Sequence, residues 1–345
     1  MSIWLIRAGG SGEYESKFLS ENRVYVTWDG YSEDLSQFSS QEELRTSLAT
    51  YYPNEKLGTI KNWSSQIWPF AHRMEIDDWV VLPSKKKGSI HFGKLKGNYV
   101  FHPKGPDPYF HSRQIEWFAT DIPRSNFDQD LLYSFGAFMT ICRISRNNAE
   151  QRIYDMSKNG WKSQVSSITT IPIEELEEST EGISGTDVER YAKDQIVKFI
   201  EARFAGHGMA RLVEAILEAK GFFTYRSPEG PDKGVDLLAA SGPLGFDGPS
   251  ICVQVKSGDT PVDRPTLDQL VGAMQNFGAD RGLLVSWAGF KSSVDKEVPA
   301  QFFRVRLWDQ DQLIDELLEC YPKLNEELKA ELPFKRVWSI AHTES

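Results

Sequence analysis

The chain has 345 residues, of which 40% are hydrophobic, and its formal net charge is -10. This length is sufficient for two ordinary domains with separate cores. No apolar run approaches the roughly 18 to 20 residues of a membrane span, and the N-terminal apolar stretch is too short for a signal peptide. Three scattered cysteines argue against a disulfide framework and a structural zinc site, so we expect a cytoplasmic protein without membrane association.

The first part of the chain alternates short strand patterns with helical ones. Strands are expected at residues 3–7, 24–28, 77–83, 89–95, 99–101 and 115–118. Helices are expected at residues 41–51, 61–73 and 128–138. This mixture predicts an α+β domain over residues 1–165, built on a small, strongly curved β-sheet.

A segment rich in Ser, Thr and Glu follows, and we interpret residues 166–185 as an exposed acidic linker. Residues 1–165 carry 20 Lys and Arg against 19 Asp and Glu, whereas residues 166–345 carry 19 against 30. An acidic balance is unusual for a protein that binds nucleic acid, although local basic patches can still contact phosphates.

Helical and strand patterns alternate over the remaining residues, 186–345. Helices are expected at residues 186–204, with Thr186 as N-cap, and at 209–220, 266–277, 292–301 and 309–319. Strands are expected at residues 222–226, 282–287 and 303–307, together with a hairpin that begins near Gly234. Helices between strands predict an α/β sandwich for this domain.

The hairpin carries the strongest chemical signal in the sequence. Apolar residues at 251, 253 and 255 alternate with Cys252, Gln254 and Lys256, so a strand here buries the first set and projects the second from its opposite, polar face. The Gly- and Pro-rich residues 241–250 allow the preceding strand to fold back and set Asp236 beside Gln254 and Lys256. An acid, an amide and an amine therefore converge on one point.

These groups suit metal-dependent hydrolysis of a phosphodiester. Mg²⁺, or Mn²⁺, would find an anionic ligand in Asp236, a neutral one in the Gln254 side-chain oxygen and a third in the backbone carbonyl of Val255. Lys256 would orient or deprotonate the attacking water and offset negative charge in the transition state. Each residue alone is ordinarily structural, but the joint pattern predicts a nuclease.

The segment 234–238, the Gln254-Val255-Lys256 tripeptide and the flanking segments 212–222 and 279–286 resemble the Mrr-type branch of the PD-(D/E)xK nucleases. The resemblance covers roughly residues 200–300 and implies that Asp236 and Gln254 bind metal while Lys256 activates water. It also implies an auxiliary acid, which helical Glu214 would match. Most of the superfamily has a carboxylate where this chain has Gln254, so metal binding should depend more on Glu214 and on the substrate phosphate.

Residues 1–165 hold seven of the ten tryptophans, and the pattern over residues 63–99 is similar to PUA-like domains of the EVE and YTH kind. Those domains hold a flipped, often modified, base in an aromatic-lined pocket. The resemblance therefore implies a modified-base pocket, for which the candidates are Trp28, Trp68, Phe70 and Tyr99. Each of these rings also suits ordinary core packing.

Two further features are candidates for contact with the DNA backbone. Lys85, Lys86 and Lys87 form a basic cluster in a turn between two expected strands. His207 lies just before the helix that carries Glu214. A solvated hairpin tip explains the lysines equally well, and packing at a helix junction explains His207.

Together these resemblances predict a modification-dependent, type IV-like DNA restriction endonuclease of phage defence. Its partner would be double-stranded DNA carrying modified bases, and cutting both strands favours a homodimer with two active sites. Two alternatives remain open. One is a structure-specific or RNA-directed nuclease, and the other is a catalytically inactive nucleic-acid-binding regulator, which Gln254 and the acidic charge would suit.

Overall fold

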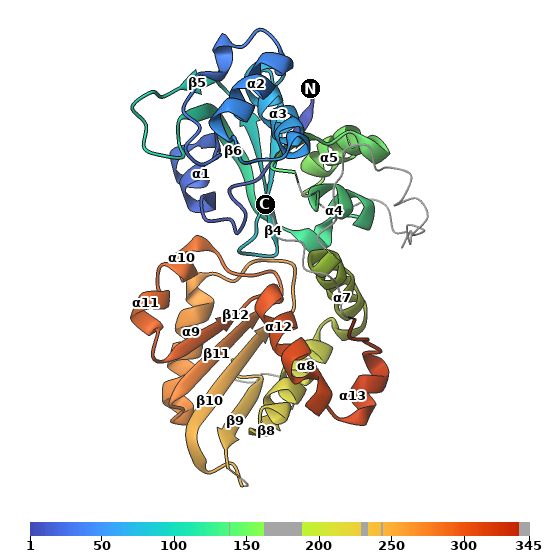
Figure 1. The fold of residues 1–345 in the computed structure, drawn as a ribbon. Coiled ribbons are helices and arrows are strands. Elements are labelled where there is room, and N and C mark those ends of the chain that lie inside the picture. Colours follow the sequence, from blue (N-terminus) through green and yellow to red (C-terminus); the bar gives the residue numbers. More distant parts are fainter. Residues whose placement is uncertain (138, 162–187, 229–233, 243, 338–345) are drawn as a thin grey trace. The chain divides into compact units, whose positions relative to one another are not determined.

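The structure is a computed structural model that describes residues 1–137, 139–161, 188–228, 234–242 and 244–337 (Figure 1). The chain divides into two compact units, one formed by Met1–Asp194 and the other beginning at Gln195. The expected linker over residues 166–185 and the expected N-cap Thr186 lie outside the described residues. Within the described ranges, no helix is both long and apolar enough to cross a lipid bilayer.

A curved seven-stranded sheet forms the framework of the first unit. Its strands are β1 (Ile3–Ile6), β2 (Arg23–Val26), β3 (Trp79–Pro83), β4 (Ser89–Leu95), β5 (Val100–Phe101), β6 (His111–Pro123) and β7 (Ile141–Arg143). They follow the order β2-β6-β4-β3-β1-β7, with β5 also paired to β6. The long strand β6 pairs with β2 and β5 at its start and with β4 thereafter, with register shifts that bend the sheet. The curved sheet expected from the sequence is confirmed.

Helices cover both faces of this sheet. They are α1 (Glu15–Glu21), α2 (Gln41–Tyr51), α3 (Leu57–His72), α4 (Gln129–Phe135) and α5 (Ala149–Lys158). The alternation along β1 shows the two cores: Trp4 and Ile6 belong to the cluster that includes residues of α2 and α3. Ile3 and Leu5 belong to the cluster that includes residues of α4 and α5.

The second unit contains a five-stranded sheet in the order β12-β11-β10-β9-β8. Its strands are β8 (Phe223–Arg226), β9 (Leu237–Ser241), β10 (Asp247–Lys256), β11 (Arg281–Ser286) and β12 (Val305–Trp308). Strands β8, β9 and β10 are antiparallel, whereas β10, β11 and β12 are parallel. The helices are α7 (Val188–Phe204), which begins in the first unit, α8 (His207–Ala219), α9 (Arg264–Phe277), α10 (Ser292–Asp295), α11 (Val298–Gln301), α12 (Gln310–Cys320) and α13 (Glu326–Glu331). Two short helices thus replace the single one expected over residues 292–301.

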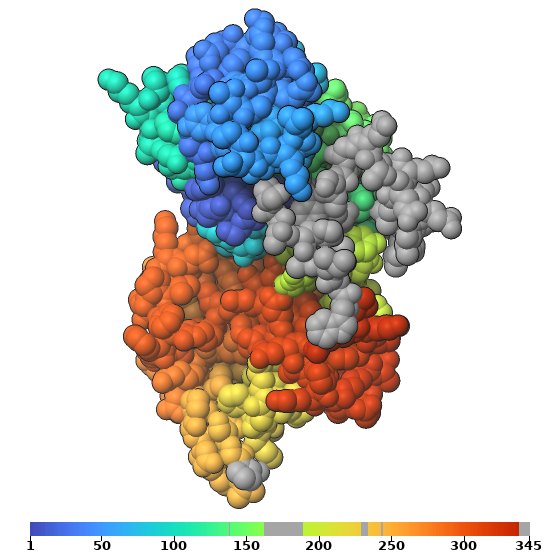
Figure 2. Space-filling view, viewed as in Figure 1, coloured from blue at the N-terminus to red at the C-terminus, as the bar shows by residue number. Residues whose placement is uncertain are grey.

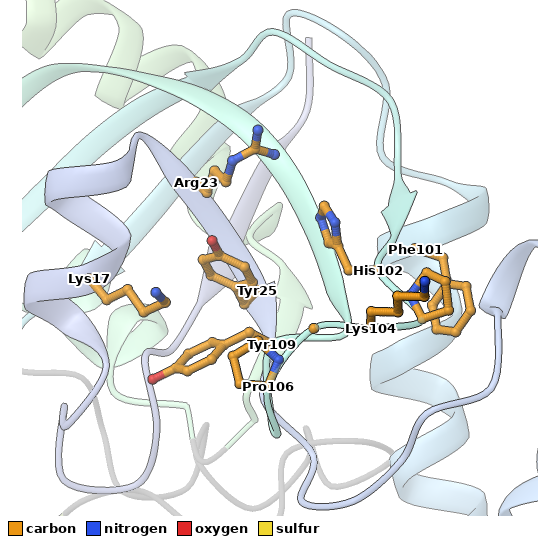
Figure 3. Close-up of a pocket in the computed structure, with 10 residues that line it drawn as sticks. Lys17, Arg23, Tyr25, Phe101, His102, Lys104, Pro106 and Tyr109 are labelled. Atoms are coloured by element: carbon orange, nitrogen blue, oxygen red, sulfur yellow. The ribbon is translucent and has the colours of Figure 1, made fainter.

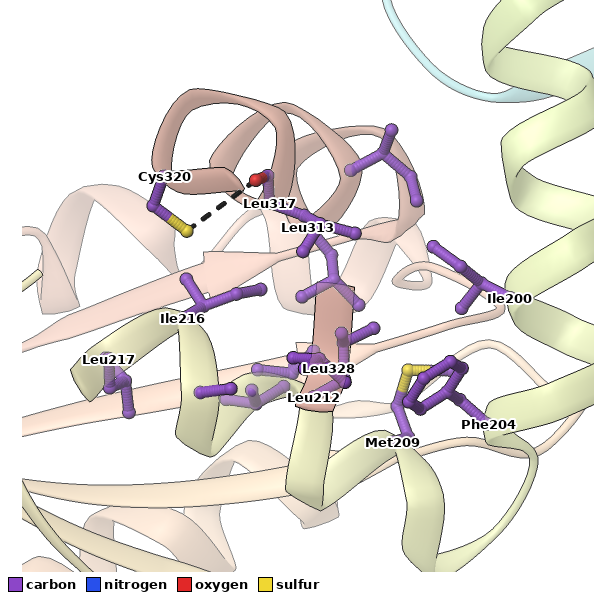
Figure 4. Close-up of a cluster of buried hydrophobic side chains, with 14 of the residues drawn as sticks. Ile200, Phe204, Met209, Leu212, Ile216, Leu217, Leu313, Leu317, Cys320 and Leu328 are labelled. Carbon is purple, nitrogen blue, oxygen red and sulfur yellow. Dashed lines mark hydrogen bonds between the residues drawn. The ribbon is translucent and has the colours of Figure 1, made fainter. Parts of the chain in front are cut away.

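Apolar cores lie on both faces of the second sheet, as an α/β sandwich requires. Figure 4 shows the first core, in which Leu212 of α8 and Leu313 of α12 pack together, and Val253 of β10 belongs to the same cluster. Cys252 points the other way, into a core with Leu270 of α9. The prediction that Cys252 lies on a polar face of β10 is therefore wrong. Cys252 is fully buried because α9 covers that stretch of the strand.

The connection between β9 and β10 projects from the surface of the second unit (Figure 2). Phe246 in this connection is 89% exposed. Asp236 immediately precedes β9 and therefore lies at the opposite end of the hairpin. The fold thus separates the hairpin tip from the candidate catalytic residues.

Candidate active site and comparison with known proteins

Asp236 is fixed to strand β10 by two hydrogen bonds. Its backbone N–H donates to the Val253 carbonyl at 2.9 Å, and the Val255 N–H donates to Asp236 Oδ2 at 2.7 Å. In the pairing of β9 with β10, Leu237 lies opposite Val253. Asp236 precedes Leu237 and extends this hydrogen-bond ladder, with a side-chain oxygen as the acceptor in place of a backbone carbonyl. The half-buried carboxylate is therefore held next to the stretch of β10 that contains Gln254.

Gln254 is almost completely buried, with 2% of its surface exposed, and its Oε1 has no hydrogen-bond partner in the described parts of the chain. Leaving a buried amide oxygen unpaired costs about 1 to 3 kcal/mol. Gly234, with φ of +81°, lies beside this side chain, and a Cβ there would come within 3.7 Å of Gln254 Nε2. This unpaired oxygen belongs to the residue next to Val255, whose N–H binds the Asp236 carboxylate, and it is suited to a hard cation that prefers oxygen ligands.

Lys256 is the last residue of β10, and its side chain is exposed. Its backbone is anchored to β11, where it pairs with Ser286, and its carbonyl accepts a 2.8 Å hydrogen bond from the Trp287 N–H. Only Val255 lies between Gln254 and Lys256, so both side chains leave the same face of β10. The strand therefore fixes the start of the lysine side chain and leaves its amine open to solvent.

Glu214, the candidate auxiliary acid, lies on α8 and forms an ion pair with a residue of β8. Its Oε2 lies 3.4 Å from Nη1 of Arg226, the last residue of β8. Burial raises the pKa of Glu214, while Arg226 acts to lower it. The neighbouring Leu212 packs in the core that contains Val253, whereas Gln254 shares the other face of β10 with Cys252. The structure thus pairs Glu214 with a guanidinium beside the site.

The oxygen donors that the structure brings together are the carboxylate of Asp236 and the backbone and amide of the Gln254-Val255 segment. In the described ranges, no group of three or more His, Cys, Asp or Glu side chains is arranged to hold a metal ion. A donor set with a single carboxylate fits Mg²⁺ or Mn²⁺, which keep several waters and use substrate phosphate as a ligand. It does not fit a cage made of protein groups alone.

The four aromatic candidates in the first unit all belong to one hydrophobic core. Phe70 is 0% exposed, so its ring is not open to a base. The Tyr99 hydroxyl bonds His111 Nδ1 at 2.8 Å and accepts from the Leu35 N–H at 3.0 Å. Trp68 stacks on His72 with the ring centroids 3.7 Å apart, and Trp28 meets Trp63 edge-on at 6.4 Å. Each of these rings therefore has a packing partner.

The candidate backbone-binding residues lie at the surface. Lys85, Lys86 and Lys87 form the turn between β3 and β4, in which the Ser84 hydroxyl accepts hydrogen bonds from the N–H groups of Lys86 and Lys87. Lys87 also lies 4.0 Å from Asp121. His207 is exposed and begins helix α8.

Comparison with protein families gives separate results for the two units. Residues 201–317 match the family model Mrr_cat, described as a restriction endonuclease. The second unit contains a restriction endonuclease domain. Residues 4–141 match a domain of unknown function, DUF8426, and this match does not assign the first unit to the PUA-like class. No curated protein matches the chain.

Two solved structures are distantly similar to this chain. The DNA modification-dependent restriction endonuclease AspBHI is 11% identical, with a TM-score of 0.34, over 74% of this chain and 67% of AspBHI. The MspJI restriction endonuclease, solved in complex with a 27-mer oligonucleotide, is 13% identical, with a TM-score of 0.30, over 74% of this chain and 64% of MspJI. TM-scores this low do not indicate a shared overall fold.

Proposed function

We propose that the chain is a divalent-metal-dependent DNA endonuclease whose active site consists of Asp236, Gln254, Val255 and Lys256. The observation that carries this proposal is the buried, unpaired Gln254 Oε1 beside an aspartate that is itself anchored to Val255. Its occurrence within the segment matched by the restriction endonuclease family supports the assignment. Glu214 acts indirectly in this scheme, through its ion pair with Arg226.

Each residue has a defined task in hydrolysis. Water attacks the phosphorus and releases a proton to solvent, the bond to the leaving sugar oxygen breaks, and that oxygen takes up a proton from solvent. A divalent cation, when bound, neutralises charge on the phosphate and makes water more acidic. Asp236, Gln254 and the Val255 carbonyl would hold that cation, and Lys256 would orient the attacking water and offset developing negative charge. The single protein carboxylate leaves room for a substrate phosphate among the ligands.

We further propose that the first unit recognises modified double-stranded DNA and that the enzyme cuts both strands as a homodimer. A tethered recognition unit raises the local concentration of substrate at a nuclease with little specificity of its own. Two active sites are needed for two strands, and one chain carries one set of Asp236, Gln254 and Lys256. A role in restricting foreign DNA inside the cell follows from this activity.

A cleavage assay with matched variants tests the proposal. Unmodified DNA and DNA with modified cytosines or adenines are incubated with wild-type protein and with Asp236→Asn, in Mg²⁺ or in EDTA. The expected result is cutting by wild-type protein only, in Mg²⁺ only, and preferentially of modified DNA. Equal cutting by both proteins would refute the assigned active site, and equal cutting of both DNAs would refute recognition of modification.

The same assay separates the alternatives. Cutting of RNA, or of branched DNA in preference to modified duplex, would identify an RNA-directed or structure-specific nuclease. Binding of DNA without cutting in Mg²⁺ or Mn²⁺ would identify a regulator. Sedimentation of the protein with and without DNA measures the oligomeric state independently of activity.

A further inference from the structure

The first unit has a surface cavity of about 540 Å³ that the catalytic proposal does not use. It lies between Lys17 of α1, Arg23 and Tyr25 of β2, and the connection from β5 to β6 (Figure 3). This volume falls within the roughly 300 to 1,000 Å³ typical of small-ligand sites.

The chemistry of the lining is aromatic and cationic. Tyr25 and Tyr109 meet edge to face with centroids 5.2 Å apart, and Lys17 Nζ lies 4.6 Å from the Tyr109 ring centroid. Arg23 and Lys104 add two more positive charges, and none of the described residues that line the cavity is Asp or Glu. Glu21 balances the charge of Lys17 at 2.5 Å. Arg23 and Lys104 therefore supply the positive charge available to a ligand, on a chain whose net charge is -10. Aromatic faces with cations suit a flat, anionic ligand, as a nucleotide is.

The walls of the cavity are held in place without a ligand. Tyr25 donates a 2.6 Å hydrogen bond from its hydroxyl to Glu21, and Lys17 pairs with the other oxygen of the same carboxylate at 2.5 Å. On the opposite wall, His102 Nε2 and the Ser112 hydroxyl are 2.7 Å apart, and Arg23 Nη1 donates to that hydroxyl at 3.4 Å. Pre-organised walls lower the entropic cost of binding.

The connection between β5 and β6 forms one side of the cavity and has an ordered backbone. Gly105 N–H donates to the His102 carbonyl at 2.9 Å, and Tyr109 N–H donates to the Pro106 carbonyl at 2.8 Å. A Cβ at Gly105 would lie 3.1 Å from the carbonyl oxygens of His102 and Tyr109, so this close turn favours glycine. The turn holds Lys104 at the exposed rim of the cavity.

We propose that this cavity takes one unstacked nucleotide of the DNA substrate, with its base against Tyr109 and its flanking phosphates at Arg23 and Lys104. Tyr25, which is 5% exposed, supports the Tyr109 ring through their edge-to-face contact. This inference rests on the proposed function, since it places DNA recognition by the first unit at this cavity and away from the fully buried ring of Phe70 and from Tyr99, whose hydroxyl is bonded to His111. A base that leaves its stack recovers part of the lost stacking energy on an aromatic surface.

The test measures DNA binding separately from cutting. Full-length protein is titrated in EDTA against a fluorescein-labelled single-stranded hexamer and a labelled duplex that carries one mismatch, and binding is followed by anisotropy. We expect Lys104→Glu and Tyr109→Ala each to weaken binding by about tenfold, because they remove a phosphate contact and an aromatic surface. Tyr109→Phe, which keeps the ring, should bind as wild type does. Lys61→Glu makes the same charge change at an exposed position of α3 outside the cavity and should also leave binding unchanged.

Each outcome decides the proposal. Unchanged DNA affinity in both Lys104→Glu and Tyr109→Ala would overturn it, as would wild-type protein that binds neither DNA. Equal weakening by Lys61→Glu would show a general charge effect and would also overturn the proposal. Displacement of the DNA by micromolar free deoxynucleotide would identify a small-molecule site and would overturn it as well. Thermal melts identify any unfolded variant, and the exposed Lys104 keeps the test valid if Tyr109→Ala does not fold. A wild-type protein that binds through this cavity but cuts no DNA would refute the proposed nuclease and leave the cavity assignment standing.

Discussion

The Val255 N–H donates a 2.7 Å hydrogen bond to Oδ2 of Asp236. The aspartate that we assign to catalysis therefore also ends the pairing of β9 with β10. An amide can accept the same bond through its oxygen, whereas a methyl group cannot. Two substitutions at one position can thus separate the charge of Asp236 from its role as an acceptor.

Asp236→Asn should lower the cleavage rate by about 100-fold or more while the free energy of unfolding stays near that of wild type. Asp236→Ala should lose cleavage and also about 1 to 3 kcal/mol of stability, because the Val255 N–H loses its acceptor. Cleavage kinetics and urea denaturation measure the two effects. An Asn variant that cuts as fast as wild type would show that no negative charge is required at this position.

Gln254 is a second residue at which a substitution can separate an effect on stability from an effect on cleavage. Gln254→Met fills a similar volume and removes the unpaired Oε1, so the free energy of unfolding should stay constant or rise by about 1 kcal/mol. Cleavage should be lost, because an oxygen ligand is gone. Urea denaturation in EDTA measures the first effect and a cleavage assay the second. A marked loss of stability would instead mean that the Gln254 amide makes a necessary internal contact.

The arrangement of Asp236, Gln254 and Lys256 is predictable because it depends on local features. The Gly- and Pro-rich connection imposes a reversal, and the alternation along β10 determines which side chains share a face. The apolar periodicity predicts the helix that carries Glu214, but the partner of Glu214 cannot be derived from the helix alone. Its contact with Arg226 depends on how α8 lies across β8, which is a tertiary relationship.

Aromatic content in the first unit illustrates a different limit. Tryptophans and tyrosines serve equally well in a core and around a ligand, so composition alone did not distinguish Phe70 from Tyr109. Helices α1 and α5 and strand β7 have no clear pattern in the sequence. Helix α5 has buried residues at Ala149, Ile153 and Met156, but they are spread among charged neighbours, and β7 has three residues.

His111 predicts a pH dependence for the stability of the first unit. It is 1% exposed, its Nδ1 bonds the Tyr99 hydroxyl and its Nε2 bonds the Tyr31 carbonyl at 2.9 Å. Burial lowers the pKa of His111 to about 4. The folded state therefore binds fewer protons than the unfolded state below pH 6.5, so stability is complete above that pH and is lost as the pH falls towards 4.

The expected loss over that window is about 3 kcal/mol. Urea denaturation at pH 7.5, 6, 5 and 4 measures it, and His111→Gln should be less stable at pH 7.5 but show a smaller decline. Equal slopes for wild type and His111→Gln would show that another group is responsible.

Arg124 and Asp194 form a buried ion pair in the first unit, with side chains 3% and 4% exposed. Two parallel hydrogen bonds of 2.9 and 2.6 Å join them, and Arg190 Nε lies 3.5 Å from the same carboxylate. Removing one partner of such a pair leaves an uncompensated buried charge, at a cost of about 3 to 5 kcal/mol, whereas replacing both with apolar residues is often close to neutral.

The two single variants should differ because Asp194 has two cationic neighbours. Arg124→Met leaves Asp194 beside Arg190, but Asp194→Leu leaves the buried Arg124 without its carboxylate, so Asp194→Leu should be the more destabilising change. The double variant should be more stable than Asp194→Leu alone. A double-mutant cycle by urea denaturation measures the coupling, and simple additivity of the two single effects would show that the pair contributes no interaction energy.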